Sequence, residues 1–210
     1  MNIKDYPTTT QRSVDTLEVN GKPARSVILS RHYNTPPDDL WDALTNRERL
    51  PRWFLPVSGE LVEGGHYQLE GNAGGTIRAC EAPHRLDVTW EFGGGVSWVE
   101  VLLAAETGGT RLTLTHTAYA DEHWEQYGPG AVGIGWDLGW LSLAIHLTPG
   151  AEPLDEATLA SSPEGKALIA RCGEAWGEAD IRAGEDPATA RAAAQNTIAF
   201  YSGENVESTD

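Results

Sequence analysis

The sequence predicts an α+β fold in which an antiparallel sheet is followed by helices. Three observations support this class. Within residues 26–54, a strand rich in β-branched residues leads into a short capped helix. Turn signals recur at intervals of roughly ten residues between 57 and 119. Apolar residues follow a helical period from 130 to 147. Because consecutive short strands joined by tight turns pair antiparallel, the middle of the chain is expected to form a meander.

The first elements are a hairpin and a helical segment. Asn20-Gly21 is a strong hairpin signal and separates residues 16–19 from a strand at 27–33. Thr35 is the expected N-cap of the helix that follows, because Pro36 suits its first position and Asp38 completes the spacing of a capping box. A second turn, capped by Asn46, is expected to carry Leu50, Trp53 and Phe54.

Six further strands are expected at 57–62, 66–71, 76–82, 85–92, 96–106 and 110–119. In the fourth, Leu86, Val88, Trp90 and Phe92 alternate with polar residues and should form the dry face. The fifth is apolar on both faces and is expected to be covered on both sides. Glu100 and His116 interrupt otherwise apolar patterns. Each is either satisfied by a neighbour or directed into a cavity, since a buried ionisable group must find a partner or lose its charge.

Helical patterns replace the strand patterns after residue 130. Val132, Trp136, Trp140, Leu143 and Leu147 recur near the helical period, which predicts one long helix. Its glycines, Gly133 and Gly135 among them, are expected to allow close approach to the sheet or to leave room for a ligand. Two more helices are expected to begin near Ser162-Pro163 and Asp186-Pro187. They should fold back on the domain or, alternatively, form the contact of a homodimer.

Composition restricts the classes of partner. The 210 residues hold 15 Lys and Arg against 31 Asp and Glu, a net charge of −16, which disfavours nucleic acids and anionic membranes. No apolar run is long enough to cross a bilayer, and the N-terminus lacks an apolar signal core. The two cysteines do not form a disulfide framework, so we expect a cytoplasmic protein with reduced thiols. The six histidines never fall in zinc-ligand spacing, and no metal or cofactor is expected.

Together these segments resemble the START-like, or SRPBCC, superfamily, and within it the branch related to the activator of Hsp90 ATPase homologue. The resemblance lies in Pro36-Pro37 followed by Leu40-Trp41, Ala43-Leu44-Thr45 and Trp53-Phe54, in the late strand 109–117, and in Gly135-Trp136 of the long helix. It implies a helix-grip fold, a curved antiparallel sheet around a long helix with a cavity between them. We therefore expect a helix-grip domain at 14–147, a helical C-terminal extension at 148–202, and a disordered tail at 203–210.

The resemblance implies three hypotheses for function. The first is non-catalytic binding of a small hydrophobic or aromatic molecule in the cavity. The expected cavity residues are Trp41, Trp53, Phe54, Trp90, Trp98, Glu100, His116, Trp136 and Trp140. The second is a cyclase- or aromatase-like enzyme in which His116 or Glu100 acts as acid or base, although no pair of residues commits itself to catalysis from sequence. The third is an Hsp90-type interaction protein.

Overall fold

The computed structural model describes residues 6–154, 159 and 161–204. Its helices are α1 (Tyr6–Thr9), α2 (Pro37–Thr45), the 3-10 helix η2 (Leu50–Arg52), α3 (Glu122–Tyr127), α4 (Gly130–His146), α6 (Pro163–Arg182) and α7 (Pro187–Tyr201). Its strands are β1 (Gln11–Val19), β2 (Lys22–Tyr33), β3 (Val57–Gly59), β4 (His66–Leu69), β5 (Gly74–Glu81), β6 (Arg85–Phe92), β7 (Gly95–Glu106) and β8 (Gly109–Tyr119). The α+β class is confirmed.

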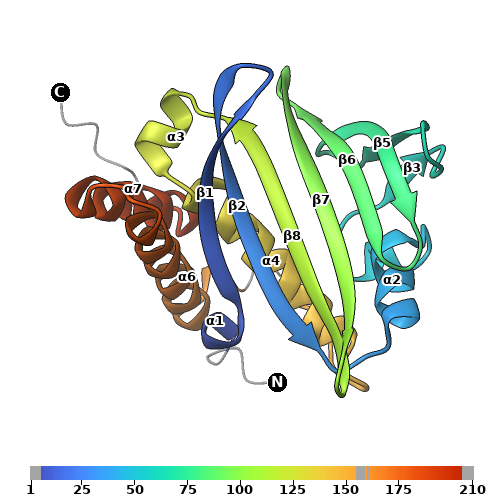
Figure 1. The fold of residues 1–210 in the computed structure, drawn as a ribbon. Coiled ribbons are helices and arrows are strands. Elements are labelled where there is room, and N and C mark those ends of the chain that lie inside the picture. The colour runs from blue at the N-terminus through green and yellow to red at the C-terminus, as the bar shows by residue number, and fades with distance from the viewer. Residues whose placement is uncertain (1–5, 155–158, 160, 205–210) are drawn as a thin grey trace. The chain divides into compact units, whose positions relative to one another are not determined.

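The strands form one eight-stranded antiparallel sheet in the order β1-β2-β8-β7-β6-β5-β4-β3 (Figure 1). Strands β3 to β8 are therefore a continuous meander in chain order, and the hairpin β1–β2 joins it through β8. The predicted turn between β1 and β2 is present, with φ of 52° at Asn20 and 72° at Gly21. Positive φ at both central residues is the signature of a type I′ turn, whose twist matches that of the strands.

The chain divides into two compact units. Of the described residues, unit 1 comprises 6–27, 119–141, 154, 159 and 161–204, and unit 2 comprises 28–118 and 142–153. Most of the sheet, α2, η2 and the last turn of α4 lie in unit 2. The N-terminal elements, α3, most of α4, and the helices α6 and α7 lie in unit 1.

In unit 2 the segment 34–54, which we call the clasp, contains α2 and η2. The helix begins one residue later than expected, because Pro36 rather than Thr35 occupies the N-cap and makes no side-chain cap bond. The predicted capping box is therefore wrong, and the Thr35 hydroxyl instead donates to the Asp39 carboxylate. Asn46 does cap the next turn, since its side chain accepts the backbone N–H of Glu48 at 2.8 Å.

The expected dry faces of the strands are partly confirmed. In β8, Leu112, Leu114 and His116 are all buried, as the alternation predicts. The interpretation of β7 as covered on both sides is wrong, because Leu102 is 39% exposed while its neighbours Val101 and Leu103 are buried. The apolar pattern of β6 also ends early, since Phe92 lies beside the turn and is 63% exposed.

In unit 1 the glycines of α4 serve a different purpose from the one expected. A Cβ on Gly133 would lie 2.2 Å from the ring of Trp176 in α6, and one on Gly135 would lie 3.1 Å from the hydroxyl of Tyr201 in α7. The absence of side chains at these two glycines therefore leaves room for residues of the C-terminal extension to pack against α4. The extension contacts its own chain in this way, and a homodimer contact stays a prediction. The predicted tail lies outside the described residues from 205 onward.

Candidate functional site

The strand register separates the predicted site residues of the sheet into two faces. Residues directly opposite in neighbouring antiparallel strands point to the same side. Val99 stands opposite His116, and Ser97 stands opposite Trp90, so these four share what we call the His116 face. Glu100 and Trp98 are the alternate residues of β7 and point to the other side.

His116 is buried on its face, at 7% exposure. Its Nε2 lies 2.8 Å from the Ser97 hydroxyl, and that hydroxyl donates to the Trp90 carbonyl at 3.0 Å. Because the hydroxyl has only one proton, Ser97 must accept from His116, which assigns the Nε2–H tautomer. Burial lowers the pKa of His116 to about 4, so the ring is neutral at physiological pH. The Trp90 ring lies beside it, with centroids 6.0 Å apart.

Glu100 belongs to an ion-pair network on the opposite face. Its carboxylate accepts from Arg85 Nε at 2.8 Å, and the same guanidinium lies 3.3 Å from Asp87. Arg78 lies 3.4 Å from the same oxygen of Asp87. The expectation that Glu100 and His116 are both directed into one cavity is therefore wrong, because adjacent strand positions oppose each other across the sheet.

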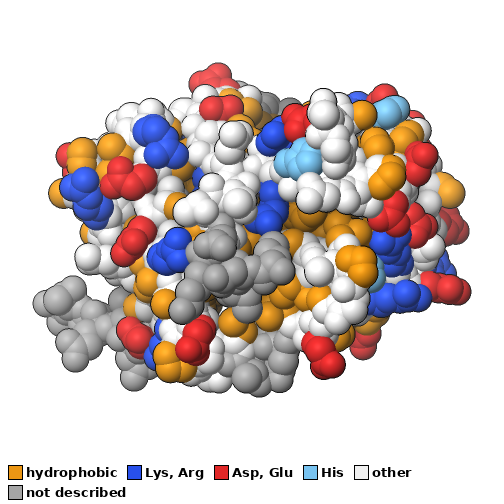
Figure 2. Space-filling view, turned by 90° about the horizontal axis from the view of Figure 1, so that it is seen from below, with side chains coloured by type: hydrophobic (Ala, Val, Ile, Leu, Met, Phe, Trp, Pro, Cys, Tyr) orange, Lys and Arg blue, Asp and Glu red, His pale blue; other side chains and the backbone are white. Residues whose placement is uncertain are grey.

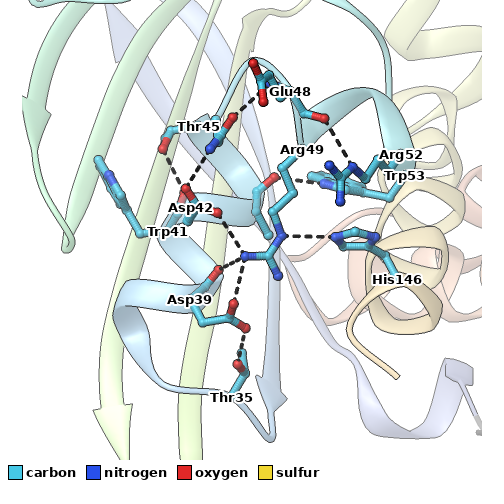
Figure 3. Close-up of polar contacts among 12 residues, drawn as sticks. Thr35, Asp39, Trp41, Asp42, Thr45, Glu48, Arg49, Arg52, Trp53 and His146 are labelled. Atoms are coloured by element: carbon cyan, nitrogen blue, oxygen red, sulfur yellow. Dashed lines mark hydrogen bonds and ion pairs between the residues drawn. The ribbon is translucent and has the colours of Figure 1, made fainter. Parts of the chain in front are cut away.

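The aromatic residues of the clasp are held firmly in unit 2. Trp53 is 8% exposed, stacks on Phe54 with centroids 5.4 Å apart, and donates its indole N–H to the Ala43 carbonyl at 2.9 Å. Trp53 therefore ties η2 to α2. Trp41 is half-buried and points from α2 away from Arg49 (Figure 3). Trp136 and Trp140 lie in unit 1, where Trp140 is fully buried in α4.

A polar cluster that sequence reasoning missed joins the clasp to the end of α4 within unit 2 (Figure 3). Arg49 donates to the Asp39 carboxylate at 2.7 Å and the Asp42 carboxylate at 3.0 Å, and its Nε donates to His146 Nε2 at 3.1 Å. These bonds lower the pKa of Asp39, whose partners are Arg49 and Thr35. Burial and the Arg49 and Arg52 cations lower the pKa of His146. No sequence pattern could have revealed this cluster, because Arg49 and His146 lie 97 positions apart.

A second missed cluster is buried in unit 1. The Arg12 guanidinium makes a two-point contact with Asp137, from Nε at 3.1 Å and from a terminal nitrogen at 2.7 Å. The indole N–H of Trp176 donates to the same carboxylate at 2.9 Å. Both charged side chains are nearly inaccessible, at 3% and 0%. The cluster links β1, α4 and α6, which identifies it as a structural element of this unit.

Other types of site find no support among the described residues. Within residues 6–154, 159 and 161–204, no group of three or more His, Cys, Asp and Glu side chains is placed to hold a metal ion. Both cysteines are free, and Cys172 is buried. No helix in the described part of the chain is long and apolar enough to cross a membrane. On the face drawn in Figure 2, Lys and Arg side chains are dispersed among Asp and Glu rather than gathered into one continuous basic patch.

Comparison with solved structures finds close agreement along most of the chain. The crystal structure of CalU16 from Micromonospora echinospora is 33% identical, with a TM-score of 0.67 over 81% of this chain and 97% of that one. The solution NMR structure of CalU16 gives 32% identity and a TM-score of 0.71 over 83% and 96%. Protein MLL2253 from Mesorhizobium loti, at 21% identity and a TM-score of 0.52 over 58% and 96%, shares the fold. These likenesses are consistent with the expected helix-grip fold.

The comparison with CalU16 extends beyond the expected domain. Residues 1–147 are fewer than three quarters of the 210, whereas CalU16 matches 81% of the chain. The similarity therefore reaches into the C-terminal helices. Comparison with curated proteins finds no match.

A protein-family comparison identifies the group to which these features correspond. The family described as activator of Hsp90 ATPase homolog 1-like protein matches residues 34–147, which include the clasp, β3 to β8 and all of α4. The matched segment is more than half of the chain, and it contains every residue of the predicted cavity. The chain therefore belongs to the activator of Hsp90 ATPase homolog 1-like family of the SRPBCC superfamily.

Proposed function

We propose that this protein binds a small, largely apolar or aromatic molecule against the His116 face of the sheet, without transforming it. Domains of this superfamily typically have a ligand-binding cavity, which supports a binding role in general. The observation that carries the proposal for this chain is the arrangement of His116, Ser97 and Trp90. An oriented polar group stands there beside an indole ring, on the strand face that also carries the buried Leu112 and Leu114.

The energetics of this arrangement support the proposal. Burying an imidazole and a hydroxyl on an apolar face costs free energy that a leucine and an alanine would avoid, even when the two groups bond to each other. The bond from Ser97 to the Trp90 carbonyl fixes the direction of the whole chain of donors. A structural role would need neither this direction nor an aromatic neighbour, whereas recognition of a planar apolar molecule benefits from both.

The same geometry bears on the alternative of catalysis. A histidine with a pKa of about 4 is neutral at physiological pH and therefore cannot serve as an imidazolium acid there. The other residue expected as an acid or base, Glu100, is paired with Arg85 on the opposite face. We therefore place binding ahead of an enzyme of the cyclase or aromatase type. Trp41, Trp53 and Phe54, which lie in the same unit as His116, remain proposed contributors to the ligand's surroundings, whereas Trp136 and Trp140 lie in unit 1 and are not assigned to this face.

The test is a titration with 8-anilino-1-naphthalenesulfonate and with naphthalene as an uncharged aromatic probe, monitored by tryptophan fluorescence. Trp90→Phe removes the indole beside His116, and Trp98→Phe is its matched control because Trp98 points to the other face. We expect saturable binding that weakens severalfold in Trp90→Phe and is unchanged in Trp98→Phe. Absence of saturation, or equal effects of the two variants with near-UV circular dichroism retained, would contradict the proposal.

A further inference from the structure

The clasp has an attachment to α4 that the proposed function does not use. Within unit 2, His146 is the last residue of α4, and Arg49 stands between α2 and η2. The two side chains meet through a single hydrogen bond of 3.1 Å, in which Arg49 Nε–H donates to His146 Nε2 (Figure 3). This bond connects the helical clasp to a segment almost one hundred residues away.

The donor determines the protonation state of the acceptor. The Arg49 guanidinium is always charged and has no lone pair to accept a proton, so the Nε2 of His146 must be the unprotonated nitrogen. The contact therefore requires a neutral imidazole with its proton on Nδ1. A second proton would occupy the nitrogen that accepts from Arg49, and the hydrogen bond would be lost.

The charges around the imidazole make protonation of His146 more disruptive to the contact. Arg49 and Arg52 both act on His146 as cations, and Asp39 is the anion that partly opposes them. Asp39 and Asp42 are themselves occupied by Arg49, at 2.7 and 3.0 Å. An imidazolium would thus replace one attractive contact with repulsion from two guanidinium groups, while Arg49 would keep its place in the clasp through the two aspartates.

We propose that His146 is a positioning residue that holds the clasp against the end of α4 through Arg49, and that protonation of its imidazole releases the clasp. If the clasp covers the proposed ligand, which rests on the proposed function, release would ease entry and exit of that ligand. The contact itself does not depend on any ligand.

The sign of the pH dependence follows from the direction of the pKa. The folded protein holds the pKa of His146 below its ordinary value of 6.5. The contact is therefore complete above 6.5 and is lost as the pH falls through the lowered pKa of the folded protein. Burial lowers the pKa of His116 to about 4, so exchange is compared at about pH 7.5 and at a pH just below the midpoint read from the ¹⁵N shifts of the His146 ring, with His146→Gln separating the two histidines.

The experiment measures hydrogen exchange of the clasp in the ligand-free protein at these two pH values, corrected for intrinsic exchange rates. His146→Gln supplies a neutral acceptor that does not titrate, and His123→Gln is the matched control on the exposed α3 helix in the other unit. In the wild type and in His123→Gln, we expect exchange of residues 36–54 to accelerate roughly three- to tenfold at the lower pH, as loss of one hydrogen bond implies. In His146→Gln, the two pH values should give the same rate.

A second measurement keeps the test decisive. The ¹⁵N shifts of the His146 ring at neutral pH should show a proton on Nδ1 and none on Nε2. The proposal is overturned if Nε2 carries the proton, if the wild-type clasp shows no acceleration, or if His146→Gln accelerates as much as the wild type. Because no ligand is present, failure here leaves the fluorescence titration of the proposed function unaffected, and failure of that titration leaves this result standing.

Discussion

Replacing Asp137 by Asn should strongly destabilise the protein, because it removes the charge that compensates Arg12. Both side chains are essentially inaccessible to water, and the donors to the carboxylate include two N–H groups of Arg12 and the indole N–H of Trp176. An Asn side chain offers one oxygen for these donors and turns an NH₂ group toward them. Breaking a buried pair by removing one partner typically costs about 3–5 kcal/mol, which is a large share of the roughly 5–15 kcal/mol that stabilises a domain.

The assay is urea denaturation followed by tryptophan fluorescence and, independently, by far-UV circular dichroism. The double variant Arg12→Met/Asp137→Leu removes both charges and should recover much of the loss, since apolar residues of similar volume often replace buried pairs at little cost. Glu106→Gln, which removes one partner of the exposed Arg111 pair, is the control and should have a much smaller effect. The reasoning is refuted if Asp137→Asn costs less than about 1 kcal/mol, or if the double variant is no more stable than Asp137→Asn.

Three further predictions concern stability. Gly133→Ala should lower the unfolding free energy measured in urea by about 1–3 kcal/mol, because its Cβ would lie 2.2 Å from the Trp176 ring. Gly135→Ala is the control and should be close to neutral, because its Cβ would meet only the Tyr201 hydroxyl, at 3.1 Å. Equal losses in the two variants would contradict this. Burial, together with the charge of Glu185, raises the pKa of Asp180 from 3.8 to about 6. The contribution of Asp180 to stability is therefore complete below pH 3.8 and is lost as the pH rises through 6. As the pH rises from about 4 to about 7.5, the unfolding free energy of Asp180→Asn should therefore increase relative to that of the wild type by up to about 3 kcal/mol. A difference that is independent of pH would contradict this. Burial lowers the pKa of His116 from 6.5 to about 4. The neutral ring therefore contributes stability that is present above pH 6.5 and is lost as the pH falls toward 4. In His116→Gln, about 3 kcal/mol of the change in unfolding free energy between these pH values should disappear. The Asp180 and His116 effects have opposite signs in the wild type, so each is measured as the difference between variant and wild type.

The two polar clusters show how the sequence and the fold differ in what they reveal. Arg12 and Asp137 are separated by 125 positions, and neither stands out in its own segment, since Asp137 is one of a few polar residues in a mostly apolar helix. The pair forms only because β1 and α4 come together in unit 1. Arg49 and His146 are likewise ordinary surface residues until the end of α4 meets the clasp.

By itself, the sequence determined the class of fold, the meander of strands, the turn at Asn20-Gly21 and the positions of the long helices α4, α6 and α7, because these depend on local propensity and on apolar periodicity. It also placed His116 on a dry strand face, since alternation is a property of neighbouring residues. The tertiary structure alone decided that Glu100 points away from His116, because that follows from which residues of β7 and β8 stand opposite each other. It also decided that Gly133 receives Trp176 rather than a strand or a ligand, because close packing between distant segments depends on shapes that no local pattern records.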